Sequence, residues 1–337
     1  MSEDRHTQKA DAVFEGGGVK GIGLVGALQA FEEHGFRWQN LAGTSAGAIT
    51  AALVAVGYKA MELKEVMNTR VDIRNLMDTS GIGKLPVIGP WLSLIFTQGM
   101  YQGEYFLQVM RELIAEKTGK QRFTFADLVM PKEPDDSEED YERKYKYKLR
   151  VIACDISDNT MLVLPQDVAR LDRNPDDLEV ALAVRMSISF PFFFKPVIVQ
   201  EAGRRRSKHW TVDGGMLSNF PIWLFDSPPG RPPAWPTIGF LLAEPASGEP
   251  HYQRIRGLVS MTRAMVKTMT AAHDRKALEG ADKRRIVQIP TGKYNTLDFN
   301  LNDSDREWLY SSGYQAAKQF LSTWSFEEYR AQRLQLF

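Results

Sequence analysis

The sequence predicts an α/β protein in which a mainly parallel central sheet carries helices on both faces. Short apolar runs that suit buried strands alternate with amphipathic runs that suit helices. The first two strand–helix pairs are each joined by a glycine-rich turn. No internal repeat is visible, and no linker is long enough to separate domains. We therefore expect one domain over residues 1–337, with its motifs in 11–225.

The expected elements follow from local patterns along the chain. Strands are expected at Ala12–Glu15, Phe36–Ala42, Leu149–Cys154, Met161–Leu164, Pro196–Gln200, His209–Val212, Thr237–Leu242 and Ile286–Ile289. Helices are expected at Ile22–His34, Ala46–Val56, Glu104–Lys117, Leu178–Met186, Gln253–Ala272 and Asp303–Ser322. In the first of these helices an apolar face repeats at helical spacing, and Gly35 is well placed to end it.

Four segments are expected at the surface. Residues 1–10 form a polar, flexible leader, and Pro131–Lys148 is a charge-dense solvated loop. Ala202–Lys208 carries three consecutive arginines between two strands, which indicates a hairpin tip. Asp226–Pro236 is a proline-rich connection. The basic tracts Arg204–Lys208 and Lys283–Arg285 could contact lipid phosphates, and the favoured interpretation is that they are exposed charges.

Composition excludes several function classes. The chain carries 42 basic and 42 acidic side chains, so it has no overall attraction to nucleic acid, and no nucleic-acid polymer is expected as a partner. Cys154 is the only cysteine, which excludes an intramolecular disulfide and a cysteine-rich zinc site. The leader lacks the apolar run of a secretory signal. Pro86 and Pro90 interrupt the uncharged stretch Leu85–Gly103, so it cannot form one spanning helix.

The first motif is a glycine loop, Gly16–Gly21, between the first strand and the first helix. Its spacing fits a dinucleotide-binding loop, which also needs an acidic residue at the end of the second strand. The second strand ends instead at Gly43–Gly47. A nucleotide-binding module that uses the Gly16–Gly21 loop is kept as the alternative of a different function class.

The second motif, Gly43-x-Ser45-x-Gly47, fits a nucleophile elbow between a strand and a helix. The turn is sharp, so side chains at Gly43 and Gly47 would collide with neighbouring backbone. Ser45 would then stand exposed at a helix N-terminus, where partial positive charge stabilises an alkoxide or oxyanion. In a parallel sheet both glycine turns lie at the same edge. The N–H groups of Gly17 and Gly18 could therefore reach an oxyanion formed on Ser45.

A serine nucleophile needs a base. The histidines are His6, His34, His209, His251 and His273. None assembles a convincing triad, and His209 would lie ~13 Å from Asp213 in an extended run. Asp213, at a strand tip before Gly214 and Gly215, could instead contact Ser45 directly. An ordinary turn is the alternative for this Asp-Gly-Gly, and the carboxylate would need burial to become a good base near neutral pH.

The three motifs G-G-G-x-K-G, G-T-S-A-G and D-G-G occur in the order that resembles the patatin-like phospholipases, and they span residues 16–215. The block Ala183–Pro196 is similar in style. Lys20 stands where that family commonly has Arg or Lys. The resemblance implies a three-layer α/β/α fold with a Ser–Asp dyad of Ser45 and Asp213. It further implies an oxyanion hole from Gly16, Gly17 and Gly18, with support from Lys20, Gly21, Gly43, Gly47, Gly214 and Gly215.

The implied activity is hydrolysis of an acyl ester, of the phospholipase A or lysophospholipase type, through an acyl-enzyme and without a metal or cofactor. The expected substrate is a phospholipid or another acyl-ester lipid; acyl transfer by the same dyad is the nearer alternative. We expect a cytoplasmic protein that contacts membrane surfaces transiently. Leu85–Tyr101 is interpreted either as core or as an interfacial segment, and Phe190–Phe194 as a wall of the acyl pocket. Nothing in the sequence identifies the head group, an oligomer or a regulatory ligand.

Overall fold

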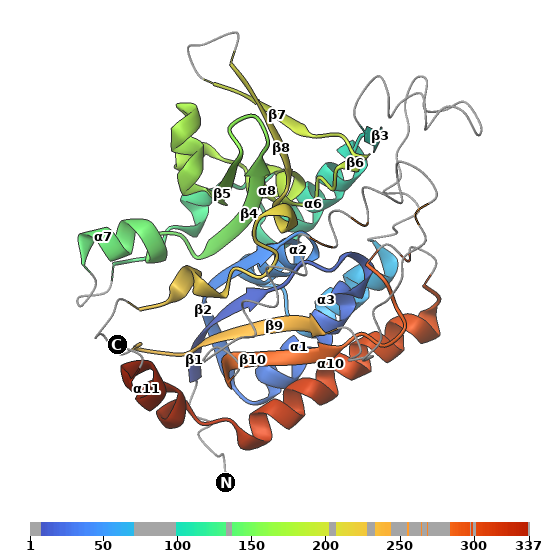
Figure 1. The fold of residues 1–337 in the computed structure, drawn as a ribbon, viewed down its shortest axis with the longest axis vertical. Coiled ribbons are helices and arrows are strands. Elements are labelled where there is room, and N and C mark those ends of the chain that lie inside the picture. Colours follow the sequence, from blue (N-terminus) through green and yellow to red (C-terminus); the bar gives the residue numbers. More distant parts are fainter. Residues whose placement is uncertain are drawn as a thin grey trace.

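The computed structural model describes residues 8–70, 99–132, 137–201, 207–227, 233–243, 255, 264, 268, 284–296, 298 and 301–335. Its centre is an eight-stranded sheet with the order β10-β9-β1-β2-β4-β8-β7, in which β5 also pairs with β4 (Figure 1). The strands are β1 (Gln8–Phe14), β2 (Phe36–Thr44), β4 (Leu149–Asp155), β5 (Thr160–Leu164), β7 (Val197–Gln200), β8 (Lys208–Asp213), β9 (Thr237–Ala243) and β10 (Ile286–Pro290).

The sheet is mixed. Strands β10, β9, β1, β2 and β4 run parallel, whereas β5 and β8 run antiparallel to β4, and β7 runs antiparallel to β8. Strands β2 and β8 pair with the same edge of β4, because β5 occupies the opposite edge along Val151–Asp155. On the shared edge, Thr44 of β2 pairs with Ile152, and Asp213 of β8 pairs with the next residue, Ala153. The C-terminal ends of β2 and β8 therefore meet beside the middle of β4.

Helices and helical turns cover both faces of this sheet. The helices are α1 (Ile22–Glu33), α2 (Ala46–Ala55), α3 (Ala60–Thr69), α6 (Glu104–Thr118), α7 (Glu138–Asp140), α8 (Val180–Ser187), α10 (Asp303–Thr323) and α11 (Phe326–Gln335). One face packs against α1, α2, α8 and α10, with α10 lying along α1 (Figure 1). The other face packs on the short helix η8 (Ile222–Phe225).

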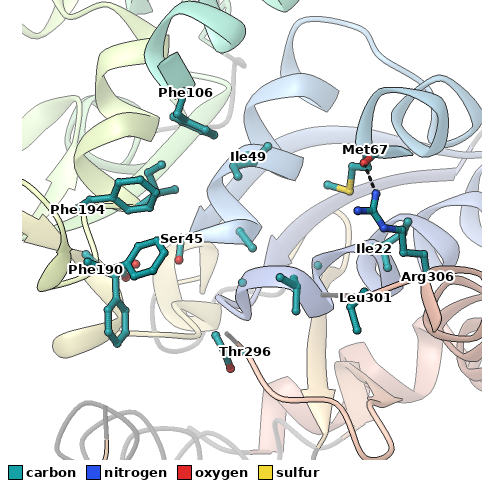
Figure 2. A pocket seen from close by; sticks show the side chains of 17 residues that line it. Ile22, Ser45, Ile49, Met67, Phe106, Phe190, Phe194, Thr296, Leu301 and Arg306 are labelled. Carbon is teal, nitrogen blue, oxygen red and sulfur yellow. Dashed lines mark hydrogen bonds between the residues drawn. The ribbon is translucent and has the colours of Figure 1, made fainter. Parts of the chain in front are cut away.

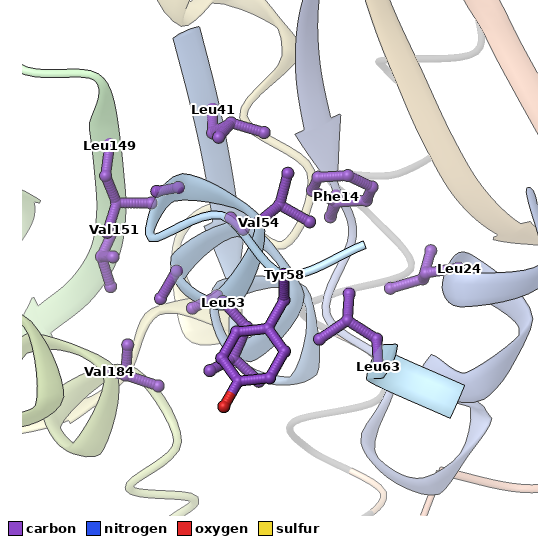
Figure 3. Close-up of a cluster of buried hydrophobic side chains, with 14 of the residues drawn as sticks. Phe14, Leu24, Leu41, Leu53, Val54, Tyr58, Leu63, Leu149, Val151 and Val184 are labelled. Carbon is purple, nitrogen blue, oxygen red and sulfur yellow. The ribbon is translucent and has the colours of Figure 1, made fainter. Parts of the chain in front are cut away.

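The main core lies between the sheet and α2. Leu53 and Val54 of α2 project among strand side chains such as Leu41 and Val151 (Figure 3). Both strand residues are fully buried. Each large apolar side chain buried in this way contributes ~1.5–3 kcal/mol of hydrophobic stabilisation. This packing fixes the start of α2, and so the turn that precedes it, against the edge of the sheet.

The predicted strands and most predicted helices are confirmed, with ends that differ by a few residues. Two surface predictions hold only in part. Within Pro131–Lys148, residues 138–145 form α7 and a further helical turn, and Asp140 and Lys144 are buried as an ion pair 3.5 Å apart. In the basic tract Lys283–Arg285, Arg285 is buried and pairs with Asp226.

Other elements are additions to the prediction. Part of the predicted leader, from Gln8 onward, belongs to β1. Helix α3 and the two-stranded sheet of β3 (Gly99–Tyr101) and β6 (Phe192–Phe194) were not expected from the sequence. Most of Gln253–Ala272 and of Leu85–Tyr101, and the tip of Ala202–Lys208, lie outside the described residues. Within the described part of the chain, no helix has the length and apolar character needed to cross a bilayer.

Candidate active site

Ser45 forms a sharp turn between β2 and α2. Its backbone angles are φ 53° and ψ −122°, a region that residues with side chains rarely occupy. Holding a serine there costs ~1–3 kcal/mol, and such strain concentrates at functional sites. The carbonyl of Ser45 accepts the first backbone hydrogen bonds of α2, from Ala48 and Ile49. The side chain therefore sits at the positive end of a ten-residue helix.

The two glycines of the elbow are required by space. A Cβ at Gly43 would lie 2.3 Å from the backbone of Gly47, and a Cβ at Gly47 would lie 2.2 Å from the carbonyl oxygen of Phe14. Both distances are far below van der Waals contact, and both obstacles are backbone, which cannot easily move. The predicted collision at these two positions is therefore confirmed.

Ser187, which the sequence analysis missed, holds the backbone of the elbow in place. The N–H of Ser45 donates a hydrogen bond of 2.9 Å to the Ser187 hydroxyl. That hydroxyl donates in turn to the carbonyl oxygen of Ile152, at 2.6 Å. Ser187 is fully buried at the end of α8, so this link ties Ser45 to β4 through one fixed side chain. The only sequence signal was its position in the block before the Asp-Gly-Gly strand.

Asp213 reaches Ser45 through strand register. Because Thr44 and Asp213 pair with consecutive residues of β4, the turn after β2 and the tip of β8 come together, although 168 positions separate Ser45 from Asp213. The side chain of Ser45 lies within hydrogen-bonding reach of the Asp213 carboxylate, and this contact acts to lower the pKa of Asp213. The N–H of Gly215 donates a hydrogen bond of 2.8 Å to Oδ1. Gly214 permits this turn, since a Cβ there would lie 2.3 Å from the Ile152 carbonyl oxygen.

Burial changes the acidity of Asp213. Only 4% of this residue is exposed, and burial raises its pKa from 3.8 to about 6. The hydrogen bonds from Gly215 and Ser45 act in the opposite direction but are weaker. A carboxylate with this pKa is largely ionised at neutral pH and still has useful affinity for a proton.

The glycine loop lies next to the elbow, as the parallel sheet predicted. A Cβ at Gly16 would lie 3.1 Å from the Cβ of Ser45. The N–H of Gly16 already donates to the carbonyl of Asn219, so Gly16 has no free donor for an oxyanion. Among the described residues, the N–H groups of Gly17 and Gly18 have no backbone carbonyl as acceptor. Gly18 has a φ of 54°, a left-handed conformation that favours glycine.

The supporting motif residues surround these groups. Lys20 is buried within the short helix η1 (Gly18–Gly21). Gly21 lines the pocket and faces α2, where a Cβ would lie 3.1 Å from that of Ala46. Three N–H groups of the loop already have acceptors: those of Gly16 and Val19 donate to the carbonyls of Asn219 and Thr296, and that of Lys20 donates to the carbonyl of Gly17. This leaves less backbone for cradling a nucleotide phosphate.

Ser45 and Asp213 open into a largely apolar pocket. Its cavity volume is about 140 Å³, and its mouth is open to solvent. Phe190, Phe193 and Phe194 contribute to its wall, as the sequence predicted, and Phe106 lies near them (Figure 2). The far side is formed by residues from the C-terminal third of the chain, which the sequence analysis did not connect with the site: Thr296, Leu301 and Arg306.

The histidines described by the structure are used elsewhere. His34 ends α1 and bonds the carbonyl of Ala30 through Nδ1. His209 lies 2.7 Å from Asp155 and 3.6 Å from Asp158, measured from Nδ1 to the nearer carboxylate oxygen. These three side chains, from β4, the turn after it and β8, form a small cluster outside the pocket lining. His6, His251 and His273 lie outside the described residues.

Several known proteins resemble this chain. The uncharacterized protein YqhO of Bacillus subtilis (strain 168) is 37% identical over 317 residues, which cover 94% of this chain and 99% of that protein. The uncharacterized protein R571 of Acanthamoeba polyphaga mimivirus is 23% identical over 322 residues, or 93% of this chain and 94% of that protein. The crystal structure of VipD from Legionella pneumophila matches in fold, with a TM-score of 0.54 at 18% identity, over 94% of this chain and 67% of that chain.

A sequence model described as patatin-like phospholipase matches residues 12–226. The matched region includes both glycine turns, Ser45, Ser187 and the Asp-Gly-Gly turn at Asp213. It covers more than half of the chain and agrees with the mixed sheet and helical layers described above. This chain belongs to the patatin-like phospholipase family of lipid hydrolases.

Proposed function

We propose that this protein is a phospholipase A or lysophospholipase that hydrolyses acyl esters through a dyad of Ser45 and Asp213. One observation carries the proposal: the side chain of a strained serine lies within hydrogen-bonding reach of a buried carboxylate inside an apolar pocket. This pairing provides a nucleophile and a base in direct contact, so no histidine is needed.

The reaction follows from this contact. Asp213 accepts the proton of the Ser45 hydroxyl while the oxygen attacks the acyl carbonyl carbon. The tetrahedral intermediate collapses, the ester C–O bond breaks, and the leaving alcohol takes the proton from Asp213. Water then loses a proton to Asp213 and attacks the acyl-enzyme. Release of the fatty acid returns the proton to Ser45.

Stabilisation of the oxyanion is assigned to backbone donors. The N–H groups of Gly17 and Gly18 are the candidates, because that of Gly16 is bound to Asn219. The N-terminus of α2 adds positive potential at the same place. Each well-placed donor is typically worth ~10²–10³ in rate. No metal or cofactor is part of the proposal.

The pocket supports an apolar acyl group. Phe106, Phe190, Phe193 and Phe194 line the wall near Ser45 and can cover a fatty acyl chain. Phe192, within the same segment, is 37% exposed. We propose that this segment contacts the membrane surface while a lipid enters, in a protein that works in the cytoplasm.

The test is to incubate the protein with vesicles of mixed phospholipids and identify the released products by mass spectrometry. We expect free fatty acid and the matching lysolipid from the wild type, and none above background from Ser45→Ala. Acyl transfer would appear instead as a new acyl ester when an alcohol acceptor is added. Equal fatty-acid release by Ser45→Ala would contradict the proposal.

A further inference from the structure

The pocket has a second polar end. Of the 17 described residues that line it, only Asp213 and Arg306 carry a formal charge. Arg306 lies near the start of α10, in the part of the chain beyond the family match at 12–226. In Figure 2, Arg306 stands on the side of Ser45 opposite to Phe190 and Phe194. The pocket thus extends from the serine in two directions, one aromatic and one ending in a cation.

The guanidinium of Arg306 has no carboxylate partner among the described residues. Its Nη1 donates a hydrogen bond of 3.2 Å to the backbone carbonyl of Met67, which is a neutral acceptor (Figure 2). The neighbouring acids on α10 are engaged elsewhere. Asp305 accepts from the Tyr294 hydroxyl at 2.7 Å, and Glu307 pairs with Lys64 at 2.9 Å. The charge of Arg306 is therefore available to a ligand in the pocket.

The surroundings of Arg306 favour a bound anion. Its neighbours in the pocket include the apolar side chains of Ile22, Met67 and Leu301. A half-buried cation beside apolar groups loses part of its hydration. A bound anion compensates for this loss by pairing with the charge. A guanidinium matches the two oxygens of a phosphate or carboxylate through parallel hydrogen bonds. Since these bonds form away from bulk water, they are stronger than at an exposed site.

We propose that Arg306 binds a phosphate or carboxylate carried by the acyl-ester substrate, while the acyl chain lies against the aromatic wall. This rests on the proposed function, because it places the scissile carbonyl at Ser45 between the two arms of the pocket. It assigns recognition of the anionic group to the C-terminal third of the chain, and the chemistry and the acyl-chain wall to the matched region. The substrate class is an anionic acyl ester rather than a neutral one.

Binding can be measured without catalysis in the Ser45→Ala variant. Isothermal titration calorimetry, below the micelle concentration, would compare dodecyl phosphate and dodecanoate with dodecanol and dodecyltrimethylammonium. The four share an alkyl chain, so their differences report the head group. We expect the better anion to bind roughly tenfold to 100-fold tighter than dodecanol. A stronger response to dodecyl phosphate would identify a phosphate, and a stronger response to dodecanoate a carboxylate.

The residue is tested by Arg306→Gln in the same background. We expect it to remove the preference for anions, and Arg306→Lys to restore part of it. Lys64→Gln is the matched control, because it removes a nearby positive charge that does not line the pocket. It should retain the preference. Anion preference that survives Arg306→Gln, or that is absent in the parent, would overturn the proposal.

A kinetic comparison separates this inference from the proposed function. In the Ser45-containing enzyme, the ratio of kcat/KM for lysophosphatidylglycerol to that for a monoacylglycerol of the same chain should fall tenfold or more in Arg306→Gln. Hydrolysis with an unchanged ratio would overturn the anion site and leave the dyad standing. Anion binding through Arg306 with no hydrolysis of any ester would overturn the dyad and leave the anion site standing.

Discussion

Two buried aspartates in the same sheet show what distinguishes a candidate base from a structural carboxylate. Asp213 and Asp11 are 4% and 2% exposed, and burial raises their pKa values to about 6 and about 7. Asp11, in β1, accepts hydrogen bonds from Asn40 and from the indole of Trp235, whose protons do not transfer near neutral pH. Asp213 lies within hydrogen-bonding reach of the Ser45 hydroxyl and lines the pocket. Both aspartates are buried and have a raised pKa. What distinguishes the candidate base is therefore the neighbouring hydroxyl and the opening into the pocket.

The largest expected effect comes from the same substitution at both sites. Asp213→Asn removes the proposed base, and we expect kcat/KM for a soluble acyl ester to fall by ~10³–10⁴-fold. Asp11→Asn is the matched control, since it also replaces a buried carboxylate by an amide, and it should retain activity within a few-fold. Circular dichroism would check that both variants are folded. Comparable activity in the two variants would remove the distinction between the two aspartates.

The pH dependence of the reaction sharpens the comparison. The proposed base must be ionised, and burial raises the pKa of Asp213 to about 6. We therefore expect kcat/KM to be constant above about pH 7 and to fall roughly tenfold per pH unit well below 6. Asp11→Asn should leave the midpoint in place. A profile that stays flat down to pH 4 would mean that Asp213 is not the group whose ionisation controls the reaction.

A smaller effect is expected at Ser187, which contacts the nucleophile only through its backbone. Ser187→Ala removes the acceptor of the Ser45 N–H, and we expect kcat to fall by about tenfold while KM changes little, because the strained turn loses one support. Ser189→Ala is the control. Ser189 is equally buried, but its hydroxyl bonds Arg185. Equal loss of kcat in both variants, or a change confined to KM, would speak against positioning.

The smallest expected effect concerns stability. The pKa of Asp11 is raised from 3.8 to about 7 in the folded protein, so the folded state binds this proton more tightly than the unfolded state. The resulting stabilisation is complete below pH 3.8 and is lost as the pH rises through 7. Between pH 5 and 8 the wild type should lose on the order of 2 kcal/mol more unfolding free energy than Asp11→Asn. Urea titrations at the two pH values would measure this difference, and parallel curves would contradict it.

The parts of the site that depend on local pattern could be predicted from the sequence. The strand–turn–helix geometry around Ser45 follows from Gly43 and Gly47, whose missing side chains leave room for passing backbone. The contact between Ser45 and Asp213 needed the resemblance to a family. It depends on β2 and β8 sharing one edge of β4, and nothing local in the three segments specifies that register.

Charged residues were the least predictable. Arg285 and Asp226 pair across 59 positions, and the charge-dense segment at 131–148 contains the buried pair of Asp140 and Lys144. A run of charged residues usually indicates a solvent-exposed segment. Such a residue can be buried only when an oppositely charged side chain pairs with it, and that partner lies either one helical turn away or far along the sequence. The role of Arg306 could not be predicted either, because its pocket is formed by segments that lie far apart in the sequence.

The most direct test of the account is labelling with a fluorophosphonate, which reacts with activated serines. Intact mass spectrometry should detect a single adduct on the wild type, and peptide mapping should place it on Ser45. Labelling should be strongly slowed in Asp213→Asn and unchanged in Asp11→Asn. Absence of an adduct on the wild type, or an adduct on another serine, would contradict the Ser45–Asp213 dyad.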